Sequence, residues 1–230
     1  MYSDECFLKD RCKRYQKHKD ECESHTTCEK LLRYEILYNN AFLTENQRKR
    51  ITLYPDADGR DREAFMTLKQ WQDNIEQAVK ENHNLYIWSE FAGNGKTSWA
   101  IKLVQAYIDA IWHTTISTKV MFINVPKFFI ELKSNISAES AYIKSINENI
   151  FKADLVVWDD IGTKSSSTFE TENLYNLINM RTDLGKTNFY TSNVAPDKLG
   201  EFLGERLGSR VGTGSTCIHL VGSDKRGLGR

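Results

Sequence analysis

A glycine-containing segment with the residues for phosphate binding lies between an apolar stretch and a helix-forming one. It reads EFAGNGKTS over residues 90–98 and follows LYIWS. Gly93 and Gly95 let backbone N–H groups curl around phosphate oxygens, and the amino end of the following helix adds positive potential. Lys96 would reach the β- and γ-phosphates, and the Thr97 hydroxyl would bind Mg²⁺. The segment predicts an ATP site formed by Ala92, Gly93, Asn94, Gly95, Lys96, Thr97 and Ser98.

The start of this segment departs from the usual phosphate-loop pattern. That pattern is G-x-x-x-x-G-K-[ST], and Glu90 stands where its first glycine would be. The departure predicts an altered start of the loop, with an effect that the sequence does not define. It also leaves open a chance occurrence of GNGKT after a strand.

Two aspartates end an apolar run farther along the chain. The run reads LVVWDD over residues 155–160, which is typical of a buried strand. The first carboxylate, Asp159, is expected to hold Mg²⁺ together with Thr97, and the second, Asp160, to orient or deprotonate the attacking water. The alternative is a strand that simply reaches the surface in two aspartates. The phosphate-loop segment earlier in the chain favours the catalytic interpretation.

Polar and basic residues near the end of the chain are further candidates for catalysis. Asn193 ends the apolar segment NFYTSN, where its amide could touch the γ-phosphate or the attacking water. Arg206 and Arg210 lie one helical turn apart in ERLGSRV. An arginine delivered to a neighbouring subunit's γ-phosphate would stabilise the charge that develops during hydrolysis. The alternatives are a strand-end turn for Asn193 and a solvated helix end for the arginines.

Four of the five cysteines fall within the first 28 residues. A tetrahedral zinc site would use Cys6, Cys12, Cys22 and Cys28, with His25 as an alternative ligand. The spacing C-x5-C-x9-C-x5-C is wider than most zinc motifs have, so free thiols and disulfides stay open. The segment has few apolar residues with which to fold unaided, which favours a metal.

Alternating apolar and helical stretches must position these residues. Strands are expected at 85–89, 120–124, 155–160, 188–193 and 216–220. Helices are expected from about Leu31 to Tyr38, over 62–79 and 96–113, from Pro126, near Ser137, and over 168–184 and 196–207. This alternation predicts an α/β fold, a parallel sheet with helices on both faces, whose site lies at the carboxyl ends of the strands.

The composition bounds the class of protein. The formal net charge is zero, so nucleic-acid binding cannot be inferred from bulk charge. No apolar run approaches the roughly 20 residues of a membrane span, and the N-terminus lacks a signal peptide's apolar core, which predicts a cytoplasmic protein without membrane contact. We expect a cysteine-rich module at 1–43, a polar linker at 44–61 and an ATPase domain at 62–230.

Four segments in this order resemble the AAA+ ATPases of the DnaC/DnaI helicase-loader type. GNGKTSWAIKL, VVWDDIG, FYTSN and ERLGSRV are similar to that family's Walker A, Walker B, sensor 1 and arginine-finger segments. The resemblance covers about residues 62 to 226 and implies an ATPase that self-associates, contacts single-stranded DNA and places a DnaB-like replicative ring helicase on DNA. CFLKDRC and the later cysteines resemble the zinc-bearing modules fused to such loaders in bacteriophages and prophages.

The sequence departs from the family's pattern near Asp160 and at its C-terminal end, and it leaves several alternative functions open. Asp160 stands where many AAA+ proteins carry glutamate, and its shorter side chain retracts the carboxylate, which predicts slow, switch-like hydrolysis. The chain ends soon after SDKRG, which predicts that the C-terminal lid is absent and leaves Arg226 as a weak substitute for sensor 2. The alternatives to a loader are an IstB-like transposition helper ATPase, a P-loop kinase, and a zinc-bearing adaptor that binds ATP only to regulate protein contacts. The sequence identifies neither the helicase, nor the size of the assembly, nor a preferred DNA sequence.

Overall fold

A five-stranded parallel sheet forms the centre of the molecule. The computed structural model describes residues 29–56, 58–135, 140–162 and 167–222. The strand order is β2-β3-β4-β1-β5, and every neighbouring pair is parallel. The strands are β1 (Leu85–Trp88), β2 (Val120–Asn124), β3 (Leu155–Asp159), β4 (Thr187–Ser192) and β5 (Thr216–His219). All five lie where the sequence predicts them, to within one residue at either end.

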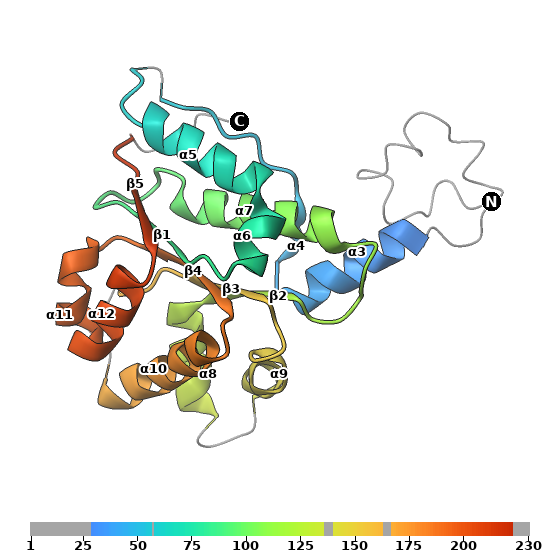
Figure 1. The fold of residues 1–230 in the computed structure, drawn as a ribbon. Coiled ribbons are helices and arrows are strands. Elements are labelled where there is room, and N and C mark those ends of the chain that lie inside the picture. Colours follow the sequence, from blue (N-terminus) through green and yellow to red (C-terminus); the bar gives the residue numbers. More distant parts are fainter. Residues whose placement is uncertain (1–28, 57, 136–139, 163–166, 223–230) are drawn as a thin grey trace.

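Helices cover both faces of this sheet (Figure 1). They are α3 (Glu29–Asn40), α4 (Glu45–Arg48), α5 (Arg62–Asp73), α6 (Ile75–Lys80), α7 (Lys96–Ile111), α8 (Val125–Ser134), α9 (Ala141–Asn149), α10 (Thr168–Asp183), the 3₁₀ turn η1 (Pro196–Lys198), α11 (Leu199–Leu203) and α12 (Glu205–Thr213). The predicted α/β class, with helices on both faces of a parallel sheet, is confirmed. Within the described ranges, no helix is long and apolar enough to cross a bilayer.

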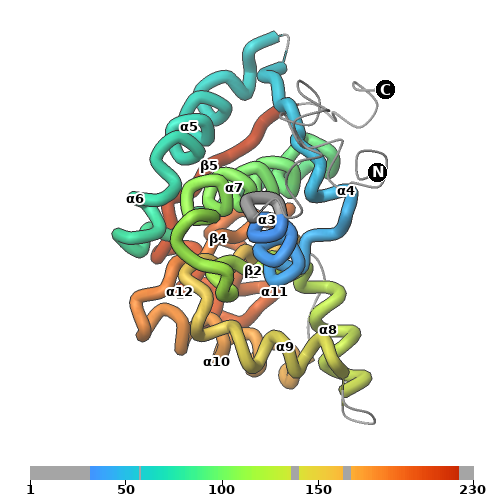
Figure 2. Tube along the Cα trace, turned by 90° about the vertical axis from the view of Figure 1, so that its right-hand side faces the viewer, coloured from blue at the N-terminus to red at the C-terminus, as the bar shows by residue number. Residues whose placement is uncertain are grey.

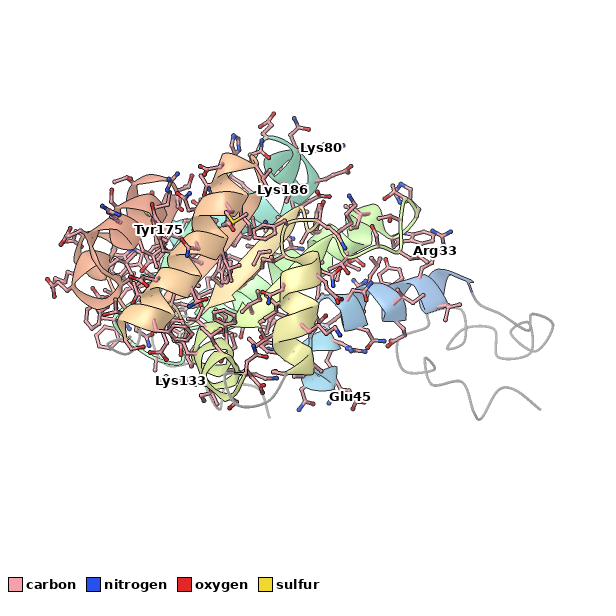
Figure 3. The ribbon with its side chains drawn as sticks, turned by 90° about the horizontal axis from the view of Figure 1, so that it is seen from below. Arg33, Glu45, Lys80, Lys133, Tyr175 and Lys186 are labelled. Atoms are coloured by element: carbon pink, nitrogen blue, oxygen red, sulfur yellow. The ribbon has the colours of Figure 1, made fainter. Side chains whose placement is uncertain are left out.

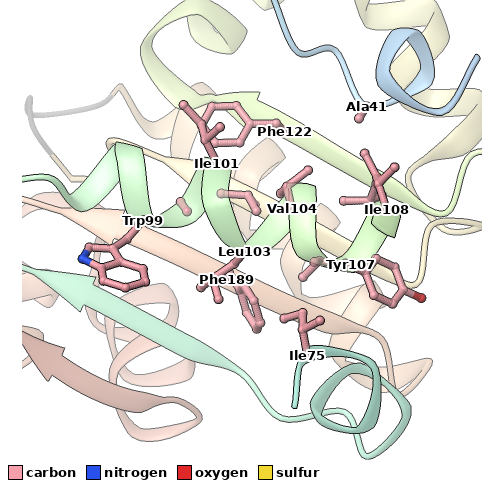
Figure 4. Close-up of a cluster of buried hydrophobic side chains, with 14 of the residues drawn as sticks. Ala41, Ile75, Trp99, Ile101, Leu103, Val104, Tyr107, Ile108, Phe122 and Phe189 are labelled. Carbon is pink, nitrogen blue, oxygen red and sulfur yellow. The ribbon is translucent and has the colours of Figure 1, made fainter. Parts of the chain in front are cut away.

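The alternation of side chains along each strand divides the core into two layers. In β1, Leu85 and Ile87 pack on the α7 side, whereas Tyr86 between them joins the cluster under α8 to α12. Figure 4 shows the first layer, in which the apolar side chains of α7 meet Phe122 and Phe189 from the sheet. Figure 3 views the opposite layer from below, with Lys133 of α8 and Tyr175 of α10 labelled.

Residues before the phosphate-loop segment are part of the first layer. Helix α3 packs on α7, as Figure 2 shows, and Leu37 and Tyr38 are buried in the core beneath α7. Farther along, the Gln105 amide of α7 donates hydrogen bonds to the carbonyls of Gln47 (2.8 Å) and Lys49 (3.0 Å). The structure therefore holds residues 44–50, expected as a linker, against α7.

The single helix expected over 196–207 is wrong: the structure has η1, α11 and α12 in its place. Gly204 has φ 78° and ψ 148°, a backbone conformation outside the helical region that favours glycine, and it separates α11 from α12. The two helices then pack closely, because a Cβ on Gly208 would lie 2.5 Å from the backbone nitrogen of Gly200. This corner sets the direction of α12, the helix that carries the two candidate arginines.

Candidate functional site

The phosphate-loop segment joins the end of β1 to the first turn of α7. Gly93 (φ 83°) and Gly95 (φ 101°) both take the left-handed conformation, which is strained for other residues. Gly95 precedes the first helical residue, Lys96, and no side chain caps this helix end. The N–H groups of the first turn point out of the helix end and, together with the helix dipole, favour an anion there. Of the other predicted loop residues, Ala92 is exposed and Ser98 is half-buried.

The ammonium group of Lys96 lies inside this loop. Its Nζ donates to the carbonyl oxygens of Phe91 (2.7 Å) and Ser89 (3.4 Å) and to Oδ1 of Asn94 (3.3 Å). Only 8% of the residue is exposed. A phosphate oxygen carries more negative charge than these neutral acceptors and forms the stronger hydrogen bond with an ammonium group. The lysine is therefore placed to exchange loop oxygens for phosphate oxygens.

Asp159 is the centre of a buried polar network at the end of β3. Its Oδ1 accepts hydrogen bonds from the hydroxyls of Thr97 (2.9 Å) and Thr191 (2.7 Å). Its Oδ2 accepts one from the Asn124 amide (3.3 Å). The two residues predicted to share a magnesium ion, Thr97 and Asp159, are thus in direct contact although 62 positions separate them in the chain.

The chemistry of this pair fits Mg²⁺. Magnesium prefers hard oxygen ligands and is often bound by one or two carboxylates, waters and substrate phosphates. A hydroxyl and a single carboxylate beside an anion-binding helix end supply that donor set. Within the described ranges, no cluster of three or more His, Cys, Asp or Glu residues could hold a metal ion. A magnesium ion at Thr97 and Asp159 would therefore take its other ligands from water and phosphate.

Asp160 has an unusual backbone and an unusual environment. Its φ is +64°, rare for a residue with a side chain, and its amide donates to the Thr191 hydroxyl at 2.9 Å. Burial raises the pKa of its carboxyl group, the negative charge of Asp159 adds to this rise, and Lys96 partly opposes it. A carboxylate with a raised pKa binds a proton more readily, which suits a group that positions or deprotonates water.

The two candidate arginines lie at the other end of the sheet. Both are on α12, one turn apart, and Arg210 contacts the side chains of Asn179 and Asp183 on α10 (3.9 Å to Asp183). They line a hollow of about 600 Å³ together with Asn84, Tyr175, Thr182, Ser209, Thr213 and Gly214. Asn84 immediately precedes β1 and Gly214 lies just before β5, so the hollow opens at the amino ends of these strands, away from Lys96 and Asp159.

A sequence profile of the bacterial DnaA ATPase domain matches residues 63–218. This chain belongs to that family. The matched region contains β1 to β4, β5 except its last residue, the phosphate loop, both aspartates and both arginines.

Solved structures of similar fold agree with this family. The DnaC helicase loader is 19% identical with a TM-score of 0.59, over 77% of this chain and 99% of the loader. DnaI is 19% identical with a TM-score of 0.61, over 80% of this chain and 95% of DnaI. A replication initiator DnaA bound to AMPPCP and single-stranded DNA is 17% identical with a TM-score of 0.59, over 79% of this chain and 52% of the initiator. A search of curated protein sequences found no match. The fold of this DnaA-family chain is therefore the AAA+ ATPase fold.

Thr191 and Asn124 both contact Asp159 in this DnaA-family domain, and neither was predicted from the sequence. Near β4 the sequence predicted only Asn193. Asn193 follows the last residue of β4, and Thr191, inside the strand, makes the contacts with Asp159 and with the Asp160 amide. Asn124 is the other residue that the sequence did not predict. The sequence shows a polar residue at the end of each apolar strand, but which of these side chains contact Asp159 depends on the register of the strands.

Several predicted residues lie outside the described ranges. They are the zinc candidates Cys6, Cys12, Cys22, Cys28 and His25, and the possible sensor residue Arg226. These expectations stay predictions from the sequence.

Proposed function

We propose that this protein binds Mg-ATP at the phosphate loop and hydrolyses it. The observation that carries this proposal is the contact between the Thr97 hydroxyl and the Asp159 carboxylate beside the open helix end at Gly95. A hydroxyl and a lysine from the start of α7 and an acidic residue from the end of β3 converge there, which is the donor set that a phosphate chain with its metal ion requires.

Each residue has a separate task in this proposal. Lys96 and the loop amides bind the β- and γ-phosphates, while Thr97 and Asp159 hold the magnesium ion, which neutralises phosphate charge when bound. Asp160 orients the attacking water and accepts its proton, since its raised pKa favours proton binding. Asn193, directly after β4, offers an amide to the γ-phosphate or the water. Thr191 keeps the two aspartates in place.

We further propose that the active site is completed by a second copy of the chain. Arg210 and Arg206 line a hollow at the amino ends of β1 and β5, whereas the phosphate loop follows the carboxyl end of β1, so the arginines do not face their own loop. Presented to the phosphate loop of a neighbour, a guanidinium group stabilises the charge that develops during hydrolysis. The chain would thus self-associate in a nucleotide-dependent manner.

The biological role we propose is the loading of a DnaB-like replicative helicase onto DNA, in the cytoplasm of a bacterium. The support is the shared fold along nearly the whole length of the DnaC helicase loader and of DnaI. The DnaA structure with single-stranded DNA supports a DNA partner for this chain as well. The resemblance of the cysteine segment favours a bacteriophage or prophage origin.

We propose that the cysteine-rich segment within residues 1–43 forms a zinc module, and that the chain joins the ATPase domain at 62–230 through α3 and residues 44–61, which begin on the surface of α7. Metal analysis of the purified protein should find about one zinc per chain, since four thiolates saturate a tetrahedral site. Replacing Cys6 or Cys22 with serine should release the metal and leave ATP binding intact. Four freely reactive thiols and no zinc in the native protein would contradict the site.

Hydrolysis of Mg-ATP, measured as phosphate release with and without single-stranded DNA and the cognate helicase, tests the proposed function. The matched control is Lys96→Ala, which deletes a phosphate contact and little core packing. We expect hydrolysis and co-purification with the helicase for the unmodified protein, and neither nucleotide binding nor hydrolysis for Lys96→Ala. Equal rates in the two proteins would exclude the loop as the site, and ATP binding without hydrolysis under any condition would favour the ATP-regulated adaptor.

A further inference from the structure

The first position of the phosphate loop holds a side chain where the usual pattern has glycine. The left-handed residues of the loop are Gly93 and Gly95, and Glu90 is not among the described non-glycine residues of positive φ. The chain can therefore leave β1 at Glu90 without the conformational freedom of glycine. A carboxylate is thus available at the start of the loop.

This carboxylate contacts the neighbouring strand. An oxygen of Glu90 lies 2.8 Å from Nε2 of His219, the last residue of β5. The imidazole ring stacks on Trp88, the last residue of β1, with ring centres 3.8 Å apart and planes inclined by 4°. Trp88 and His219 are partners in the β1–β5 register, so the stacking follows directly from strand pairing. We call Glu90, His219 and Trp88 the clasp.

A second contact joins the same strand end to the middle of the loop. The buried Asn94 amide donates to the carbonyl oxygen of Leu220 at 2.8 Å. The Leu220 amide in turn donates to the Trp88 carbonyl at 2.8 Å. Since Oδ1 of Asn94 also accepts from Lys96, the residues at the end of β5 are linked to the lysine that faces the phosphates.

We propose that Glu90 and His219 are positioning residues that hold the start of the phosphate loop against the end of β5. This rests on the proposed ATP site. The clasp and the Asn94 contact fix the loop to two consecutive residues, His219 at the end of β5 and Leu220 after it, so that its amides and Lys96 keep the spacing that the phosphates need. Neither the Glu90 nor the His219 side chain touches the nucleotide in this role.

The exposure of Glu90 and His219 indicates that their contact positions the loop more than it stabilises the fold. The side chains of Glu90 and His219 are 55% and 36% exposed, and half-exposed ion pairs contribute little to the free energy of folding. The backbone amide of Glu90 and then His219 lower the pKa of the Glu90 carboxyl group, so it is ionised at neutral pH. Removing the contact should therefore change loop geometry more than the stability of the domain.

The test is the dissociation constant of Mg-ADP, measured by titration of a fluorescent analogue, for the full chain and four variants. These are Glu90→Ala, His219→Ala, the double variant, and His219→Gln, which retains an N–H donor. We expect about three- to fivefold weaker binding in either alanine variant, no further loss in the double variant, and partial recovery in His219→Gln. The kcat at saturating ATP and the Tm should change little.

His83→Ala is the matched control, because His83 is also an exposed histidine near a glutamate, 3.6 Å from Glu81, and lies away from the loop. It should bind nucleotide like the unmodified chain. Tight binding by all clasp variants, additive losses in the double variant, or a Tm that falls in step with affinity would overturn the clasp while the ATP site stands. No binding by the unmodified chain would overturn both.

Discussion

At the carboxyl end of the sheet the polar side chains contact one another, whereas at the amino end the arginines of α12 line an open hollow. Asp159 accepts three hydrogen bonds from side chains of three other segments and is only 4% exposed. Arg206 is exposed, and Arg210 is half-buried and makes polar contacts with the side chains of Asn179 and Asp183 on α10. One end is preorganised inside a single chain, and the other is built on the surface.

This difference indicates how two copies can complete each other. A preorganised carboxylate network needs no reorganisation when a metal-bound phosphate arrives, which favours catalysis. Arg206 is exposed and Arg210 is partly exposed, so both guanidinium groups are accessible to a group on another copy. Because the two kinds of group lie at opposite ends of the strands, a head-to-tail contact between copies would bring them together.

Arg210→Ala should lower ATP hydrolysis by about three orders of magnitude, as loss of an arginine supplied by a neighbour does elsewhere. Nucleotide binding should be unchanged, because the loop and its aspartates are intact. Phosphate release and a nucleotide titration measure the two quantities. Lys80→Ala, an exposed residue paired with Glu76 on α6, is the control for a lost surface charge. Normal hydrolysis by Arg210→Ala would remove the amino end from the active site.

Asp160→Asn should lower hydrolysis by about two orders of magnitude through loss of the base, with Mg-ATP binding retained. Loss of binding would instead mean that the roles of Asp159 and Asp160 are exchanged. The same change should raise the Tm at pH 7 by about 1–4 °C. It removes a carboxylate whose negative charge is disfavoured by burial and by the neighbouring Asp159.

The pH dependence of this gain in Tm has a definite sign. The pKa of Asp160 is raised in the fold, so its ionised form opposes folding at neutral pH. As the pH falls through the raised pKa, the carboxyl group takes up a proton and the penalty disappears. The Tm difference between Asp160→Asn and the unmodified chain should therefore be largest near neutral pH and close in acid. A difference that widened in acid would contradict the assigned direction.

Thr191→Val should lower hydrolysis by about tenfold, because the hydroxyl holds Asp159 and accepts from the Asp160 amide. Valine keeps the shape but leaves two polar groups without this partner, so unfolding should cost about 1–3 kcal/mol less. Ser192→Ala is the matched control: its hydroxyl donates to the Ile161 carbonyl and touches neither aspartate. It should lower stability without a comparable loss of kcat, and equal losses of kcat would contradict a role for Thr191.

Arg181→Met should leave the rate per folded molecule within about twofold and instead destabilise the domain by about 3 kcal/mol. Arg181 is fully buried in α10 and donates to carbonyl oxygens of Ala153 (2.9 Å) and Thr187 (2.6 Å). Burial lowers the pKa of its guanidinium group to about 10, which still leaves it charged. Chemical denaturation and phosphate release separate the two effects. A lower rate of hydrolysis per folded molecule would contradict this and give Arg181 a part in hydrolysis.

The sequence predicted what depends on local pattern. The strands are short apolar runs, and the loop and paired aspartates are contiguous motifs, so their positions follow from spacing alone. Asn124 and Thr191 were missed because their contacts with Asp159 depend on the register of β2, β3 and β4. The pairing of Glu90 with His219 likewise joins residues 129 positions apart. Gly204 split an expected helix because the left-handed region is open to glycine whatever the periodicity around it.

Mixing two inactive variants tests the complementarity of the two ends most directly. Arg210→Ala keeps an intact phosphate loop, and Lys96→Ala keeps an intact arginine. Measured alone, each should release almost no phosphate. Mixed in equal amounts under conditions in which co-assembly is demonstrated, they should regain ATP hydrolysis, because some contacts pair the intact loop of one chain with the intact arginine of the other. Proven co-assembly with no recovered hydrolysis would contradict a site completed by the neighbouring copy.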